Sequence, residues 1–145
     1  MKKWIHNYIH CGLLGWFLEM IFTAFHAFRR RDYRLPCTTS VWMFPIYGLA
    51  SLLAPLCRIL RRCGFNFIFR GLVYTGVIFT GEFLTGIWLR KRDLCPWNYE
   101  RARWNLGKVI RLDYAPCWFI TGLLFERLLT ESEKRPGGAS SDNPT

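Results

Sequence analysis

Two glutamates stand alone inside long apolar stretches of the sequence. Glu19 is the only charged residue within 4–28, and Glu82 is the only one within 71–89. Stretches of about 20 apolar residues are long enough to cross the hydrocarbon core of a bilayer as helices. A carboxyl group at such a depth costs roughly 2.5–3.5 kcal/mol on insertion scales. Each glutamate is therefore expected to have a polar partner or a chemical task.

The positions of the two glutamates put them at a similar depth below one face of the membrane. If four helices cross, both ends of the chain lie on one side, here called side A, and the loops 29–39 and 90–113 lie on the other, side B. At a rise of about 1.5 Å per residue, Glu19 lies about 15 Å and Glu82 about 12 Å below side B. Tyr47 enters its helix from side B and reaches a similar depth. The sequence therefore predicts a polar pocket that opens to side B and has the two glutamates as its floor.

The residue types leave three roles open for this carboxyl pair. The groups could be protonated and hydrogen-bonded to hydroxyl or indole groups, because burial disfavours the charged form. They could bind a cation or relay protons, or they could meet arginines that fold inward from the loops. A glutamate pair without a His-rich or nucleophile motif does not identify an enzyme, so no catalytic residue is assigned.

The cysteines give no sign of a metal site. The sequence has six of them, and no two have C-x-x-C spacing, so neither a zinc site nor another cofactor is expected. Cys37 and Cys95 fall in predicted loops on side B. The sequence leaves open whether these two form a disulfide or remain inert thiols.

The elements that must position the glutamates are helices. The clustering of charge between apolar stretches predicts an all-α, polytopic membrane protein, a bundle of about four transmembrane helices. The expected helices span about 4–28, 40–60, 65–89 and 114–130. The segment 131–145 has no apolar run and is expected to be a disordered tail.

The helix faces suggest how these elements pack. In the first helix Gly12, Gly15 and Glu19 share one small and polar face, while Leu13 and Phe17 lie on the reverse. Small residues allow close approach of helices, so the first face should pack inward. In the helix 65–89, Thr-Gly pairs recur at five-residue steps that turn round the axis. Small residues on several sides predict that this helix lies at the centre of the bundle.

The positive charge fits a membrane surface rather than a nucleic acid. The formal net charge is +10, and Lys and Arg occur in short clusters beside the apolar stretches, at 29–31, 61–62 and 90–92. The expected partner is therefore a lipid bilayer with anionic head groups. Nucleic acid is not expected, because its binding needs a continuous basic face on a folded module. Of the 20 Lys and Arg residues, 9 fall on side A and 11 on side B, which leaves the orientation undecided.

Five motifs follow one another along most of the chain: GWFLEMIFTA (15–24), TSVWMFPIYG (39–48), GEFLTG (81–86), CPWNY (95–99) and NLGKVIRLDYAPCWF (105–119). In these motifs the chain is similar to the transmembrane protein 229 family and to the CmpB-like type IV ABC-transporter permeases with which that family is grouped. The resemblance implies a multi-pass protein of the cell membrane and supports the fourth helix. It marks as shared positions Glu19, Glu82, Trp97, Tyr99 and Asn105.

The sequence and the resemblance together predict a permease or transport component that binds a small polar or cationic ligand. The candidate ligand-binding residues are Glu19, Glu82, Tyr47, Trp97, Tyr99 and Asn105. The sequence has no P-loop, so any ATPase would be a separate chain. Two alternatives stay open. One is a membrane-embedded enzyme acting on lipid head groups, with loop arginines on the phosphate and the carboxyls as acid and base. The other is a structural or regulatory membrane partner without a ligand.

Overall fold

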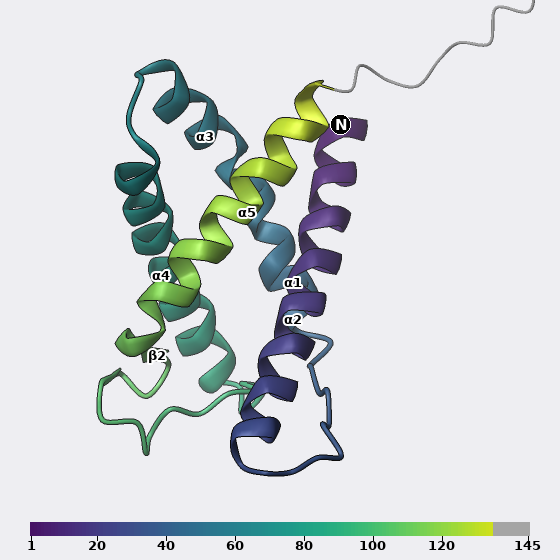
Figure 1. Cartoon of the computed structure of the whole chain (residues 1–145), viewed down its shortest axis with the longest axis vertical. Coiled ribbons are helices and arrows are strands. Elements are labelled where there is room, and N and C mark those ends of the chain that lie inside the picture. Colours follow the sequence, from purple (N-terminus) through teal and green to yellow (C-terminus); the bar gives the residue numbers. More distant parts are fainter. Residues whose placement is uncertain (135–145) are drawn as a thin grey trace, which may run out of the picture.

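The computed structural model describes residues 1–134. In chain order the elements are α1 (Lys2–Arg29), α2 (Met43–Gly48), the 3₁₀ turn η1 (Leu49–Leu52), α3 (Leu53–Arg62), α4 (Phe67–Arg90), the strands β1 (Asn105–Leu106) and β2 (Ile110–Arg111), the 3₁₀ turn η2 (Leu112–Tyr114) and α5 (Ala115–Lys134). The long helices run up and down between the two ends of the molecule, and the loops 30–42 and 91–114 meet at the end opposite to the N-terminus (Figure 1). The predicted all-α bundle is confirmed.

Three helical segments are long and apolar enough to cross a membrane: Lys2–Arg29, Met43–Arg62 and Phe67–Arg90. α5 completes the bundle although it carries more charge. It crosses diagonally between α1 and α4 (Figure 1) and contacts α4, α3, α1 and η1. The protein is thus a polytopic helical membrane protein whose last helix packs across the other helices.

The outward faces of the helices are apolar, as a lipid environment requires. On α1, Leu13 and Phe17 are 51% and 57% exposed, whereas Gly12 and Gly15 are buried against the rest of the bundle. Glycines on the inner face let α1 and α2 approach closely. The predicted inward and outward faces of this helix are confirmed.

α4 does not occupy the centre of the bundle, so that prediction was wrong. Nothing lies within 4 Å of a Cβ built at Gly76 or Gly81, and Leu84 is 62% exposed. The threonines of the Thr-Gly pairs are satisfied within α4 itself. Each threonine hydroxyl donates to a glycine carbonyl four residues earlier, as in Thr80 Oγ1 to Gly76 at 2.8 Å. These bonds satisfy hydroxyl groups inside an apolar helix without any neighbouring helix.

The predicted helix 40–60 is interrupted by its prolines. α2 begins only at Met43, so Pro45 lies in the first helical turn, where its missing N–H would have no helical partner. After Gly48 the α-helix gives way to the narrower 3₁₀ turn η1. Pro55 cannot donate to the carbonyl of Ser51, and its ring would clash with that carbonyl in a regular α-helix.

The C-terminal helix is longer than the predicted 114–130. α5 continues to Lys134, because polar contacts hold its last turn. Arg127 Nε lies 3.1 Å from Glu131 Oε1, and Ser132 Oγ lies 2.6 Å from Asn7 Oδ1 on α1. Residues 131–134 are therefore helical rather than part of a disordered tail, and the rest of the predicted tail, 135–145, lies outside the described residues.

Candidate functional site

The first predicted glutamate is held by the second helical segment. Tyr47, on α2, donates its Oη hydrogen to Glu19 Oε2 at 3.0 Å. Tyr47 itself is only 8% exposed. Its ring lies directly against Gly15, where a Cβ would overlap the ring atoms. The glycine one turn before Glu19 therefore creates the space in which the tyrosine reaches the carboxylate.

The second glutamate lacks such a partner. Glu82, on α4, is half-buried, and its Oε2 is buried without a hydrogen-bond partner among residues 1–134. The indole N–H of Trp118, on α5, is the polar group nearest to this carboxyl, but neither its Nε1 nor Glu82 Oε2 makes a hydrogen bond of normal geometry within that part of the chain. Trp118 is therefore at most a weak partner of Glu82 across the α4–α5 contact.

The loop on side B brings Tyr99 to the same place. Burial raises the pKa of Tyr99, and the charges of Glu82, Tyr114 and Glu19 raise it further. Both carboxyls therefore lie within electrostatic range of this phenol, which remains a neutral hydroxyl at physiological pH. Of the six candidate residues, Glu19 and Tyr47 are hydrogen-bonded, and Glu82 and Tyr99 lie within electrostatic range of them.

The other two candidates use their polar groups inside the loop. Trp97 Nε1 donates to the carbonyl of Val109 at 2.9 Å, and its ring packs over Gly86 of α4. Asn105 Nδ2 donates to the carbonyl of Ala102 at 2.6 Å. Both side chains hold the path of the loop, and their donors are already engaged.

A polar network ties the end of this loop to α1. Arg111 Nη1 donates to Tyr114 Oη at 3.1 Å, and that oxygen lies 3.4 Å from His26 Nε2. The Arg111 guanidinium also holds Asp113, and this hydrogen bond lowers the pKa of the Asp113 carboxyl. Tyr99 packs edge-on against Tyr114, with ring centroids 5.7 Å apart. The network thereby fixes the loop that carries Tyr99.

The two loop cysteines do not form a disulfide in the described structure. Cys37 is exposed and Cys95 is partly buried, with its Sγ 3.2 Å from the carbonyl of Trp97.

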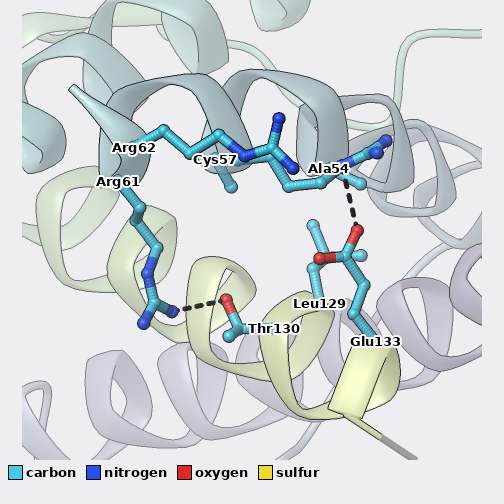
Figure 2. A pocket seen from close by; sticks show the side chains of 8 residues that line it. Ala54, Cys57, Arg61, Arg62, Leu129, Thr130 and Glu133 are labelled. Carbon is cyan, nitrogen blue, oxygen red and sulfur yellow. Dashed lines mark hydrogen bonds and ion pairs between the residues drawn. The ribbon is translucent and has the colours of Figure 1, made fainter. Parts of the chain in front are cut away.

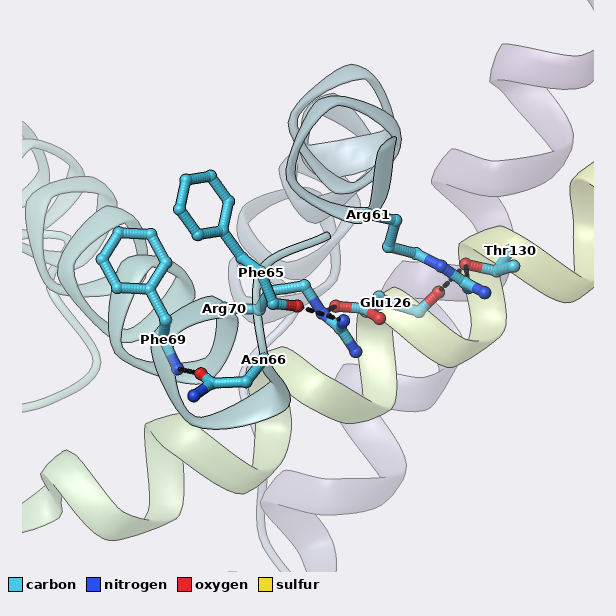
Figure 3. Close-up of polar contacts among 7 residues, drawn as sticks. All are labelled: Arg61, Phe65, Asn66, Phe69, Arg70, Glu126 and Thr130. Carbon is cyan, nitrogen blue, oxygen red and sulfur yellow. Dashed lines mark hydrogen bonds and ion pairs between the residues drawn. The ribbon is translucent and has the colours of Figure 1, made fainter. Parts of the chain in front are cut away.

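The sequence analysis overlooked a polar cluster near side A. Glu126, on α5, is 6% exposed and accepts from Arg70 Nε at 3.0 Å. Arg70 also donates to the carbonyl of Phe65, and Arg61 donates to Thr130 Oγ1 at 2.9 Å (Figure 3). A signal for this cluster was present in the sequence, because Glu126 shares helical spacing with small and apolar residues that are buried. Those residues are Gly122, Phe125 and Leu129.

Two hollows lie at this end of the bundle, each of about 240 Å³. The first is lined by α3 and α5 (Figure 2), and Arg61 and Thr130 line both. Neither contains Glu19 or Glu82. A ligand pocket at the level of the two glutamates therefore stays a prediction.

Helices with apolar outer faces and buried carboxyl groups between them define a polytopic α-helical membrane protein of transporter-like type. The chain belongs to the family described as "Putative ABC-transporter type IV", whose model matches residues 6–135. This match confirms the resemblance to the CmpB-like proteins and gives no support to the transmembrane protein 229 name. No solved structure matches the chain.

Proposed function

We propose that this protein is a permease-type transport component of the cell membrane that binds a small polar or cationic ligand at Glu19 and Glu82. Membership of an ABC-transporter family and three apolar helices support the transport role. The chain has no P-loop, so an ATPase that drives transport would be a separate chain.

The observation that carries the ligand site is the unused oxygen of Glu82. A buried acceptor without a partner costs about 1–3 kcal/mol, and more when it is charged. Glu82 Oε2 has no such partner within residues 1–134. A polar group kept at this cost inside a membrane helix is typical of an ion or substrate path.

The neighbouring groups suit a ligand that carries protons or positive charge. Glu19 offers a second carboxyl oriented by Tyr47 at 3.0 Å. Tyr99 adds a neutral hydroxyl from side B, because its pKa is raised by burial and by the nearby carboxyls. Trp97 and Asn105 keep a supporting role in this proposal, since their donors hold the loop. An amine or a hydrated cation would satisfy acceptors that the protein leaves open.

Reconstitution of the full chain in lipid vesicles tests the proposal. Entrapped fluorescent indicators report H⁺, Na⁺ and K⁺ entry, and radiolabelled choline serves as an organic cation. We expect flux of at least one probe, lost in Glu82→Gln and reduced in Glu19→Gln, with helical circular dichroism retained. Glu131→Gln is the matched control, because Glu131 lies near side A with a 60% exposed side chain. Flux that is present in the parent and unchanged in the Glu82→Gln protein would refute the site.

A further inference from the structure

The first hollow on side A is built mainly from arginines. Its wall on α3 carries Arg58, Arg61 and Arg62, and its wall on α5 carries Thr130 and Glu133. Figure 2 shows Arg61 reaching from α3 to Thr130 of α5, while Arg62 lies along α3 at the edge of the hollow. Three guanidinium groups and one carboxylate give this lining a net charge of +2.

The contacts of these arginines leave donors free. Arg58 Nε lies 3.0 Å from Glu133 Oε1, in a partly exposed ion pair. Arg61 uses Nη1 to reach Thr130 Oγ1 at 2.9 Å. The guanidinium group of Arg62 makes no hydrogen bond or ion pair with the side chains and carbonyls of residues 1–134. Since a guanidinium has five N–H donors, most donors at this hollow are unpaired.

The spacing of the three arginines brings like charges close together on α3, and a bound anion would reduce their repulsion. Residues three and four apart lie on one face of a helix, and like charges there repel one another. The three arginines occupy such positions at the end of the apolar stretch Met43–Arg62. This end is where a spanning helix meets lipid head groups. Arginine also matches phosphate with two parallel hydrogen bonds, which lysine cannot do.

The second hollow is a poorer anion site. Its lining has the same net charge of +2, from Arg61, Arg70, Arg127 and Lys134 against Glu126 and Glu131. Arg70 pairs with Glu126 and Arg127 pairs with Glu131, so its cations without an ion pair among residues 1–134 are Lys134 and Arg61, which lines both hollows. The first hollow instead offers two arginines without an ion pair, Arg61 and Arg62, and a guanidinium can bind phosphate with two parallel hydrogen bonds.

We propose that the first hollow, between α3 and α5, binds a phosphate monoester. Such a group carries a charge of about −1.5 to −2 at neutral pH, which complements the net charge of the lining. It also offers three acceptor oxygens to the guanidinium groups. The monoester belongs either to a phosphatidic-acid-type lipid or to a soluble phosphate ester. This site is separate from the Glu19 and Glu82 level and does not depend on transport.

Calorimetric titration of the detergent-solubilised full chain tests the site. The ligands are dioctanoyl phosphatidic acid, dioctanoyl phosphatidylglycerol as a phosphodiester, and glycerol 3-phosphate. We expect the monoester lipid to bind about tenfold more tightly than the diester, because it forms more charge-assisted hydrogen bonds. Arg62→Gln should weaken monoester binding about tenfold, and Arg61→Gln should do the same. Lys3→Gln removes one charge from side A outside the hollow, and it should change the affinity less than twofold.

The outcomes separate the sources of the phosphate. Tight binding of phosphatidic acid with weak binding of glycerol 3-phosphate assigns a lipid, and similar binding of both assigns a soluble ester. Either result supports the site if the Arg62→Gln substitution weakens that binding. Equal binding of monoester and diester lipids, or equal losses in Arg62→Gln and Lys3→Gln, would reduce the effect to general surface charge and overturn the proposal. Arg62→Gln breaks no contact described above, so it decides the matter even if Arg61→Gln unfolds.

Discussion

Two glutamates at opposite ends of the α4–α5 contact, Glu126 and Glu82, have opposite surroundings. Glu126, near side A, is 6% exposed and accepts a charged hydrogen bond from Arg70 at 3.0 Å. Glu82, nearer side B, has a buried oxygen with no partner among residues 1–134. The first carboxylate completes an ion pair between two helices. The second has no such pair among these residues, and the proposed ligand site depends on this difference.

Two arginines near side B, Arg90 and Arg111, do not pair with Glu82. Arg90 donates to the carbonyl of Lys108 at 3.2 Å, and Arg111 is engaged by Asp113 and Tyr114. Pairing with inward-folded loop arginines was one of the roles that the sequence left open. In the described contacts, these two guanidinium groups are used within the loop and not on the glutamates. Among residues 1–134, Glu126 thus has an arginine partner and Glu82 has none.

The largest expected effect follows from breaking the paired carboxylate. Arg70→Gln should lower the free energy of unfolding by about 3 kcal/mol, because it leaves Glu126 buried without its counter-charge. Unfolding by SDS in mild detergent, followed by circular dichroism, measures the loss. The double variant Arg70→Met with Glu126→Leu should recover most of it. If Arg70→Gln were as stable as the parent, Glu126 would not differ from Glu82 in the way described.

A smaller loss of stability is expected from disturbing the packing of the Tyr47 ring against Gly15. Gly15→Ala should cost about 2 kcal/mol, because the new methyl group overlaps the Tyr47 ring and forces the helices apart. Gly81→Ala is the matched control on α4, where no atom lies within 4 Å. It should gain up to about 1 kcal/mol from helix propensity. Equal effects of the two substitutions would show that α1 and α2 do not pack as described.

The hydroxyl of Tyr47 should contribute less than its ring. Tyr47→Phe removes the donor at 3.0 Å from Glu19 Oε2 and should cost about 1.5 kcal/mol, the usual value for a hydrogen bond to a charged group. A double-mutant cycle with Glu19→Gln isolates this contact. A coupling energy near zero would mean that Glu19, like Glu82, lacks a partner in solution.

The sequence predicted the helices well where local composition decides them. Charge-free stretches located three membrane helices, and the glycine face of α1 indicated the side on which Glu19 lies. The centre of the bundle was misplaced, because small residues on several sides of α4 were taken as a sign that other helices surround it. The threonine hydroxyls of α4 instead bond to carbonyls of their own helix, and α5 contacts more of the other helices. Small residues spread round a helix therefore do not show that it is surrounded.

The loop residues show why the candidate site was predicted only in part. Trp97 and Asn105 have the types of a binding residue, yet their donors go to the carbonyls of Val109 and Ala102. Those contacts depend on how 91–114 folds back on α4, which no periodic pattern encodes. Glu126 was missed because no local pattern links it to the residue that pairs with it, Arg70. Its arginine partner lies far away in the sequence.

The smallest expected effect on stability is at Glu82, and it is the sharpest test of the comparison. Glu82→Gln is isosteric and removes a carboxyl that lacks a counter-charge among the described residues, so the free energy of unfolding should stay equal or rise by up to about 1 kcal/mol. Glu126→Gln should instead destabilise the protein, because it removes the acceptor of Arg70. The same SDS titration measures the free energy of unfolding of the two variants, Glu82→Gln and Glu126→Gln. A loss at Glu82 as large as that at Glu126 would mean that this carboxyl also holds the helices together, and the unpartnered oxygen could then no longer support a binding role.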